Sequence, residues 1–353
     1  SAINAPEFTR AAGGVTLSGI DLQLMWPCSD GYVSVTLLFG PALGPFTRNL
    51  FEWIFEEGFC DEETRDKDWI NYGELLFGGT EPVEEYTRVK AVVGAFCASK
   101  TKEELFGESF SRRLLIAPVT TTQDVLNSPH LSERSMWETI RIGDRNVTFP
   151  GRMAIFSETP QKTLSRPPKV GEHTTAVLSE PLRRPNIAIS TVPNRQGKAL
   201  EGLKILDFMW VMAGPAGSRI LADYGANIVR IDSEARMDTA RTLQPFRDDI
   251  GLPDNSALYS NMNAGKRGLS LDLNNQKSLA VVNDLVQWAD VVLESFSPRA
   301  MKKFGCDYTS LKKIKPEIVM ASSRIMGQTG PYTSLAGYGT MAAAISGFFN
   351  ITG

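Results

Sequence analysis

The chain has 353 residues, of which 42% are hydrophobic and 22% charged, and its formal net charge is −3. This size allows two or three domains with their own cores, and the small negative charge argues against nucleic acid or an anionic membrane surface as a partner. No apolar run reaches the roughly 20 residues that a membrane-spanning helix needs. The four cysteines are scattered without a CxxC pair, which predicts reduced thiols in a cytoplasmic protein.

The first half of the chain predicts short strands and helices. Residues 27–35, PCSDGYVSV, contain a turn signal before an alternating strand. Residues 101–105 predict the start of a helix, because a threonine can serve as the N-cap and acids follow in the first turn. Near the end of this half, Thr174 and Thr175 are expected to cap a helix over residues 176–180.

Residues 181–198 separate the two halves. They are rich in proline and arginine and carry few large apolar side chains, a composition typical of a linker. We therefore expect two units, residues 1–180 and residues 199–353, with this linker between them.

The second half opens with a strand–helix–strand pattern. Residues 203–208 form an apolar run that predicts a buried strand, and residues 228–231 predict the next strand. Between them, the glycines and proline of AGPAG predict a turn, followed by a helix over residues 218–224 that Gly225 ends. This is a βαβ unit of the doubly wound kind. The turn does not match GxGxxG, so an NAD-binding dehydrogenase is an alternative that the turn does not support.

The pattern of alternating strands and helices continues towards residue 353. A basic turn, NAGKR, leads into a short strand, and a helix is predicted over residues 275–289. Apolar runs over residues 290–294 and 318–323 predict two more strands. Strands that alternate with helices in this way predict an α/β protein with a doubly wound parallel sheet.

Dispersed motifs of both halves resemble class III CoA-transferases, the family that includes formyl-CoA transferase, the carnitine CoA-transferases and α-methylacyl-CoA racemase. Residues 199–353 resemble the N-terminal half of that family, through LEG, the AGP turn, LADYGAN, GKR, AD followed by LE, and GQTGPY, in this order. Residues 26–180 resemble its C-terminal half, through CSDG, APV, SPHL, FPG and GEHTTAVL, with a poorly matched insert at residues 52–86.

This resemblance implies a Rossmann-like large domain in residues 199–353 and a smaller α+β domain with a closing helix in residues 1–180. The two halves then stand in reversed order. We expect a fragment of a tandem protein, in which the end of one module precedes the start of the next, and the absence of an initial methionine fits an excised segment. A circular permutation is the alternative.

The resemblance also implies a reaction. An aspartate would attack an acyl-CoA, form an aspartyl-CoA thioester and pass CoA to a small carboxylic acid, with no bound cofactor other than CoA as substrate. That aspartate is expected shortly after Gly353, so we expect no catalytic nucleophile in this chain and no turnover by the fragment alone. The family's interlocked dimers imply a homodimer or pairing with the rest of a tandem transferase.

Two other functions remain open within this resemblance. The chain could be a non-catalytic CoA-binding or scaffolding module that completes a partner's active site, because several family positions differ here. It could also be an acyl-CoA racemase or isomerase, although Tyr338 and Gly339 stand where that branch carries its histidine and aspartate.

The candidate CoA-binding residues follow from the same resemblance and from the needs of CoA, which are cations for its phosphates and close backbone approach along its pantetheine arm. They lie in the turns that follow predicted strands or precede them: Val211, Met212, Ala213, Asn263, Lys266, Arg267, Phe296, Lys303 and Arg324. The chain has two histidines, His130 and His173, which lie in separate motifs. We expect both to be structural, through capping or a core hydrogen bond, and we predict no metal site.

Overall fold

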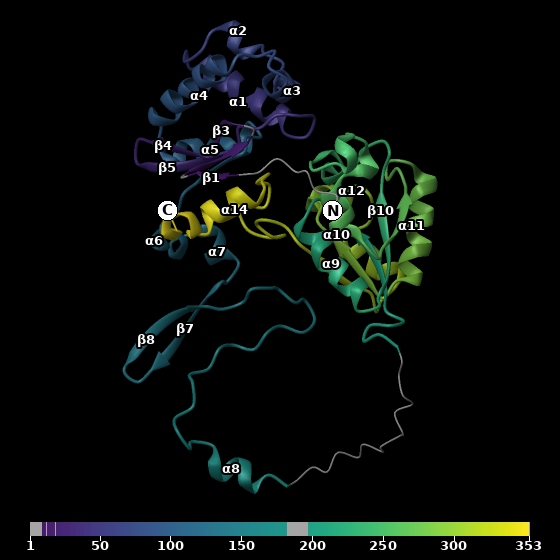
Figure 1. Ribbon diagram of the computed structural model, residues 1–353. Helices are drawn as coiled ribbons and strands as arrows, with labels where there is room; N and C mark the ends of the chain where they lie inside the picture. The colour runs from purple at the N-terminus through teal and green to yellow at the C-terminus, as the bar shows by residue number, and fades with distance from the viewer. Residues whose placement is uncertain (1–8, 12, 18, 182–196, 353) are drawn as a thin grey trace.

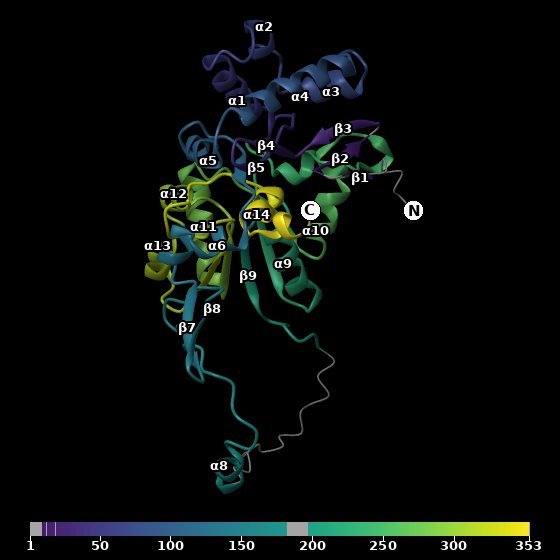
Figure 2. The same cartoon turned by 90° about the vertical axis from the view of Figure 1, so that its left-hand side faces the viewer.

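The computed structural model describes residues 9–11, 13–17, 19–181 and 197–352 (Figure 1). Up to residue 150 the chain is built on antiparallel sheets, and from residue 197 it is built on a parallel sheet; we call these the N-terminal and C-terminal regions. Residues 151–181 leave the N-terminal region as an exposed segment that carries the short helix α8 (Thr174–Ser179), which lies apart from both regions in Figures 1 and 2.

The C-terminal region contains five parallel strands in the order β11-β10-β9-β12-β13. Ile205 of the central strand lies opposite Ile228 on one side and Val291 on the other. The predicted doubly wound parallel sheet is therefore confirmed. The strands are β9 (Lys204–Phe208), β10 (Asn227–Asp232), β11 (Arg267–Ser270), β12 (Val291–Glu294) and β13 (Val319–Ser322).

The strand order changes direction between β9 and β12. The chain first adds β10 and β11 on one side of β9, and then adds β12 and β13 on the other side. In doubly wound sheets, ligands bind at such a switch point, outside the carboxyl ends of the strands. Here the segments that follow β9 and β12 meet at that position.

Helices cover both faces of this sheet. Leu206 and Phe208 of β9 belong to the core beneath α11 (Gln276–Trp288) and α13 (Tyr308–Ile314), whereas Ile205 belongs to the core beneath α9 (Ala213–Asp223). This alternation is what a strand buried on both faces requires. Two further helices complete the region, α10 (Ala257–Asn263), which contacts α9, and α12 (Pro298–Lys303).

Helix α9 begins five residues before its predicted start at residue 218. The predicted AGPAG turn is wrong, because proline is tolerated in the first turn of a helix, where it displaces no intrahelical hydrogen bond. Gly214 is needed there for close packing, since a Cβ at this position would lie 2.6 Å from the sulfur of Met209. The predicted helix end is confirmed, with Gly225 at a φ of 103°.

The N-terminal region packs helices against a three-stranded antiparallel sheet and around an aromatic core. Phe51 and Trp69 stack with their ring centroids 4.0 Å apart, and Trp26 is buried in the same cluster. The predicted start of a helix at Thr101 is confirmed by a capping box with Glu104. The elements of this sheet and its helices are β4 (Met25–Cys28), β5 (Gly31–Val35), β6 (Ile116–Pro118), α1 (Gly44–Glu56), α2 (Glu62–Arg65), α3 (Tyr72–Phe77), α4 (Val83–Ala98) and α5 (Lys102–Ser111).

Smaller elements flank this region. One is a three-stranded sheet and one is a two-stranded hairpin, and two short helices lie between β6 and the hairpin. They are β1 (Thr9–Ala11), β2 (Gly14–Leu17), β3 (Ile20–Gln23), α6 (Thr122–Leu126), α7 (Pro129–Glu133), β7 (Trp137–Ile142) and β8 (Arg145–Pro150). In α8, the predicted threonine caps are wrong, because the helix begins two residues earlier than expected and both threonines lie inside it.

The end of the chain packs against the N-terminal region. Helix α14 (Gly339–Ile345) contacts β5 and β6, and α15 (Phe348–Thr352) follows it (Figure 2). Ala117 of β6 shares a buried cluster with Met341 and Ala344. The hydroxyl group of Thr120 donates to the carbonyl oxygen of Ile345 at 2.7 Å. Residues 339–352 therefore lie on the antiparallel sheet rather than on the parallel one.

A second contact joins α7 to the GQTG loop, residues 327–330. His130 is buried, its Nε2 lies 2.8 Å from the carbonyl oxygen of Met326, and its Nδ1 accepts a hydrogen bond from the backbone N–H of Tyr332. Arg134 donates to the hydroxyl group of Thr329 at 2.8 Å. The predicted structural role of His130 is confirmed as a core hydrogen bond, whereas His173 is exposed and forms no side-chain cap.

Candidate active-site turn and cleft

The turn after β9 is held in an unusual backbone conformation. Val211 has a φ of 71°, a region that costs a β-branched residue about 1–3 kcal/mol unless the surroundings impose it. The backbone N–H groups of three successive residues donate to side chains, that of Met209 to Asp207 at 2.8 Å, that of Trp210 to Ser295 at 2.9 Å and that of Val211 to Asp238 at 3.0 Å. The acceptors come from β9 and from the segments after β12 and β10, so three parts of the sheet fix this turn.

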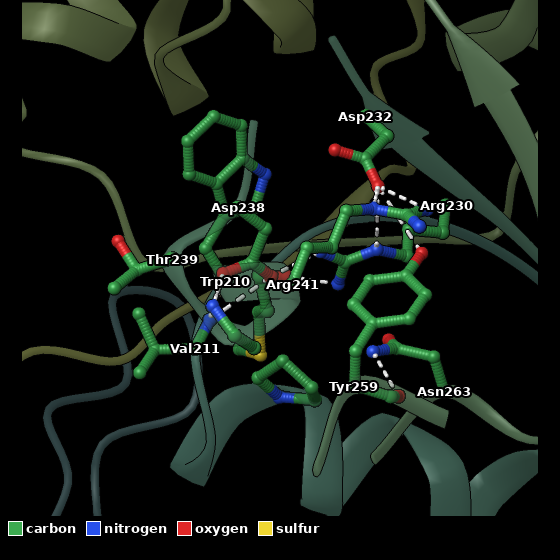
Figure 3. Close-up of polar contacts among 12 residues, drawn as sticks. Trp210, Val211, Arg230, Asp232, Asp238, Thr239, Arg241, Tyr259 and Asn263 are labelled. Atoms are coloured by element: carbon green, nitrogen blue, oxygen red, sulfur yellow. Dashed lines mark hydrogen bonds and ion pairs between the residues drawn. The ribbon is translucent and has the colours of Figure 1, made fainter. Parts of the chain in front are cut away.

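Asp238 connects the turn to a buried arginine. Its carboxylate is fully buried and forms a close ion pair with Arg230 of β10, which also donates to the carbonyl oxygen of Met209 (Figure 3). The carboxylate also accepts from the N–H of Ala240 and so caps the 3-10 helix η1 (Thr239–Thr242). These contacts fix the turn through hydrogen bonds and an ion pair that are buried together.

Next to this pair lies a second network around Asp232, at the end of β10. Arg241 and the hydroxyl group of Tyr259 both donate to the same carboxylate oxygen, at 2.9 and 3.1 Å (Figure 3). The Arg241 guanidinium lies 3.6 Å from the centroid of the Tyr259 ring. Burial favours the neutral acid, but the hydrogen bonds and charges of Arg241 and Arg230 outweigh it and lower the pKa of the Asp232 carboxyl.

The structure places five of the predicted site residues beyond the carboxyl ends of the strands, around the switch point. Met212 is 46% exposed, and Val211 and Ala213 flank it at the start of α9. Phe296 comes after β12, and its ring lies 5.1 Å from that of Trp210. Lys303 of α12 is exposed, and its ammonium donates to the side chain of Asn274, just beyond β11. These positions all lie beyond the carboxyl ends of the strands.

Three other predicted residues lie elsewhere. The ammonium of Lys266 is buried beneath α9, 3.1 Å from the carboxylate of Asp207 and 2.9 Å from the side-chain oxygen of Asn263. Burial lowers the pKa of Lys266, while Asp207 opposes this shift. Arg267 is exposed and donates to Asn227, at the amino ends of β10 and β11. The length of the sheet therefore separates Arg267 from the turn. The charge of Lys266 is compensated inside the protein by Asp207.

Arg324 follows β13 and lines a cleft of about 1880 Å³ between the two regions. One wall of the cleft comes from α7 and residues 152–159, and the other comes from β13 and residues 323–329. Glu294, at the end of β12, is buried nearby and accepts from the N–H of Phe296 and from the side-chain amide of Gln328. Burial raises the pKa of the Glu294 carboxyl above its usual range.

Asp238, Arg230, Arg241 and Tyr259 are not among the residues that the sequence predicts. One signal could have found them, since Arg230 is a charged residue inside an otherwise apolar strand, and a buried charge needs a partner. In the described part of the chain no group of three or more histidines, cysteines or acids could hold a metal ion. None of the helices described is both long and apolar enough to cross a bilayer.

Comparison with known proteins identifies relatives of both regions. The family profile described as CoA-transferase family III matches residues 10–174 and 200–353. A succinate–glutarate CoA-transferase of Agrobacterium fabrum is 36% identical over 167 residues, 47% of this chain and 42% of that protein. An acetyl-CoA:oxalate CoA-transferase of Acetobacter aceti is 35% identical over 163 residues, 46% of this chain and 41% of that protein.

Two further relatives match different shares of this chain. A probable CoA-transferase of Mycobacterium tuberculosis is 27% identical over 340 residues, which cover 93% of this chain and 38% of that protein. The crystal structure of a CaiB/BaiF family protein from Brucella suis is 34% identical and covers 43% of this chain and 40% of that chain, with a TM-score of 0.40. The chain thus spans less than half the length of these relatives. Because the family profile covers most of both regions, the chain belongs to CoA-transferase family III.

Proposed function

We propose that this chain is part of a tandem CoA-transferase that moves CoA between an acyl-CoA and a free carboxylic acid. The observation that carries the proposal is the turn at Val211, whose conformation is fixed by three side-chain acceptors next to the open amino end of α9. A helix amino end offers free N–H groups and a positive dipole to an anionic or thioester ligand. CoA would pass Met212 with its pantetheine arm and direct its phosphates towards Lys303.

The order of the two regions supports a tandem arrangement. The family profile matches them as two separate blocks, and the mycobacterial relative aligns with 93% of this chain over 38% of its own length. The end of one module followed by the start of the next would give such a match. We propose that the missing parts, or a second copy, complete the active site. This completion corresponds to a homodimer or to pairing within the tandem protein.

In the proposed reaction, an aspartate outside this chain attacks the thioester carbonyl of the acyl-CoA and expels CoA as a thiolate. The thiolate then attacks the aspartyl carbonyl of the resulting anhydride, which gives the aspartyl-CoA thioester and the free acid. The carboxylate of the acceptor acid repeats both steps in reverse and leaves with CoA. The residues of this chain would bind and orient CoA during these steps.

A non-catalytic CoA-binding module is the second candidate, and Ser295 favours it. The Ser295 hydroxyl accepts the N–H of Trp210, so it holds the turn and brings no amide that could bind the nucleotide. Such a module would bind CoA without forming a covalent intermediate.

Two experiments test these proposals. Calorimetric titration of the 353-residue chain with CoA should show binding, and Met212→Asp should weaken it about tenfold or more, because a carboxylate would occupy the helix amino end and lie against the pantetheine arm. Val170→Asp, at a fully exposed residue in the segment before α8 and outside the cleft, is the control. Hydroxylamine trapping on the full-length tandem protein should then yield an aspartyl hydroxamate with an acyl-CoA. CoA binding without a hydroxamate would favour the non-catalytic module.

A further inference from the structure

The guanidinium of Arg324 has no partner among the described residues of the protein. Among the described residues, no hydrogen bond or ion pair reaches its guanidinium, and its Nη1 is buried without a partner. The residue lines the cleft between α7 and β13. A guanidinium that the protein leaves without an acceptor favours a ligand that supplies one.

The other lysine and arginine residues of the described cleft walls have partners. Arg134 donates to Thr329, and the remaining three each lie within 4 Å of an acid: Lys102 of Asp124, Arg152 of Glu138 and Lys312 of Glu158. Among the described cations of these walls, Arg324 is therefore the one whose guanidinium has neither a hydrogen bond nor an ion pair.

Glu294 is near enough to interact with the charge of Arg324, but its carboxylate oxygens are bound by other donors. Its two carboxylate oxygens accept hydrogen bonds from the Phe296 N–H and the Gln328 side chain, at 2.8 and 2.9 Å. Among the described residues no ion pair within 4 Å joins it to Arg324.

We propose that Arg324 binds the carboxylate of the acid substrate of the transferase, and that the cleft holds its short hydrocarbon chain. This inference rests on the proposed function. A planar guanidinium binds a carboxylate with two parallel hydrogen bonds, and its single charge matches that of a monocarboxylate. The indole N–H of Trp137 is a second buried donor without a partner in the same cleft, and Met136, Phe156 and Ile345 provide apolar walls.

The test measures binding of butyrate to the 353-residue chain by ligand-observed NMR, with butyramide as its uncharged analogue. Arg324→Gln should weaken butyrate binding at least tenfold, Arg324→Lys should restore part of it, and butyramide should bind weakly to all variants. Arg267→Gln is the matched control, because this exposed arginine lies at the opposite ends of the strands. Thermal unfolding of each variant checks that it is folded.

Titration with CoA separates this inference from the proposed function. We expect the CoA affinity of Arg324→Gln to stay within twofold of the parent chain. Equal butyrate binding by the parent and Arg324→Gln would overturn the inference, as would a loss of CoA affinity with butyrate binding unchanged. If no variant binds CoA while butyrate binding still depends on Arg324, the acid site stands and the proposed function fails.

Discussion

The carboxylate of Asp238 lies 3.0 Å from the backbone nitrogen of Val211 and keeps this residue at a φ of 71°. The same carboxylate pairs with Arg230, which is as deeply buried as its partner. The Asp238 side chain therefore links the buried Arg230 of β10 to the turn after β9, which lies at the switch point of the sheet. Changes at Asp238 should affect both stability and ligand binding.

Asp238→Ala should lower the free energy of unfolding by about 3 kcal/mol or more, because it leaves the buried charge of Arg230 without a partner. It should also release the turn at Val211 and weaken CoA binding. Urea unfolding and calorimetry measure the two effects. Asp254→Ala is the control, because Asp254 pairs with Arg241 through an exposed carboxylate, and it should change stability by less than about 0.5 kcal/mol. Equal effects of both substitutions would contradict the role given to Asp238.

Lys266→Met should destabilise the fold by about 3 kcal/mol, since the carboxylate of Asp207 would lose its buried cation. Arg267→Met, at the next position but exposed, should change the free energy of unfolding by less than about 0.5 kcal/mol. Chemical denaturation distinguishes the two. If Lys266 instead bound a CoA phosphate directly, its replacement would leave the stability of the ligand-free chain unchanged.

The stability of the protein should fall as the pH drops below about 6.5, in part through His130. Burial lowers the pKa of this histidine, with a further contribution from Arg134, while the hydrogen bond to Met326 and the charge of Glu133 oppose the shift. The native state then binds fewer protons than the unfolded state below the unfolded pKa of about 6.5, so acid favours unfolding.

His130→Asn removes this titration. Between pH 7 and pH 5, the free energy of unfolding of the variant should depend less steeply on pH, by up to about 1.4 kcal/mol per pH unit. His173→Asn is the natural control, because His173 is the other histidine of the chain and is exposed. Identical pH profiles for the parent and His130→Asn would show that His130 does not contribute.

Gly330→Ala should destabilise the contact between α7 and the GQTG loop. The added Cβ would lie 2.7 Å from Nδ1 of His130, and Gly330 has a φ of 94°. Gly202→Ala is a close control, because Gly202 has a φ of 92° and no atom within 4 Å of the added Cβ. The control should lose about 1 kcal/mol from backbone strain alone, and Gly330→Ala should lose at least about 1 kcal/mol more. Thermal unfolding of the pair isolates the steric part.

The sequence could predict the parallel sheet because all of its strands except β11 contain a short apolar run followed by a turn or a helix. Val211, Met212 and Ala213 were expected after the first of these strands, and they follow β9. The sequence missed the start of α9, because a proline and two glycines indicate a turn unless the packing of Gly214 against Met209 is known. It also missed α10, a helix of only seven residues that ends where the predicted NAGKR turn begins.

The details of the site depend on contacts between residues far apart in the chain. Lys266 and Arg267 are adjacent, yet one points beneath α9 to Asp207 and the other lies exposed beside Asn227. No local pattern distinguishes two neighbouring cations of this kind. The position of α14 on β6 likewise joins Thr120 to Ile345 across 225 residues, and composition carries no information about such a pairing.

The packing of α14 on β6 predicts how the protein behaves after proteolysis. Contacts of Thr120, Ala117 and His130 bind the end of the C-terminal region to the N-terminal region. A chain cleaved by a protease between residues 181 and 197 should therefore migrate as a single species on gel filtration and separate only under denaturing conditions. Two separately expressed halves should likewise reassemble when they are mixed.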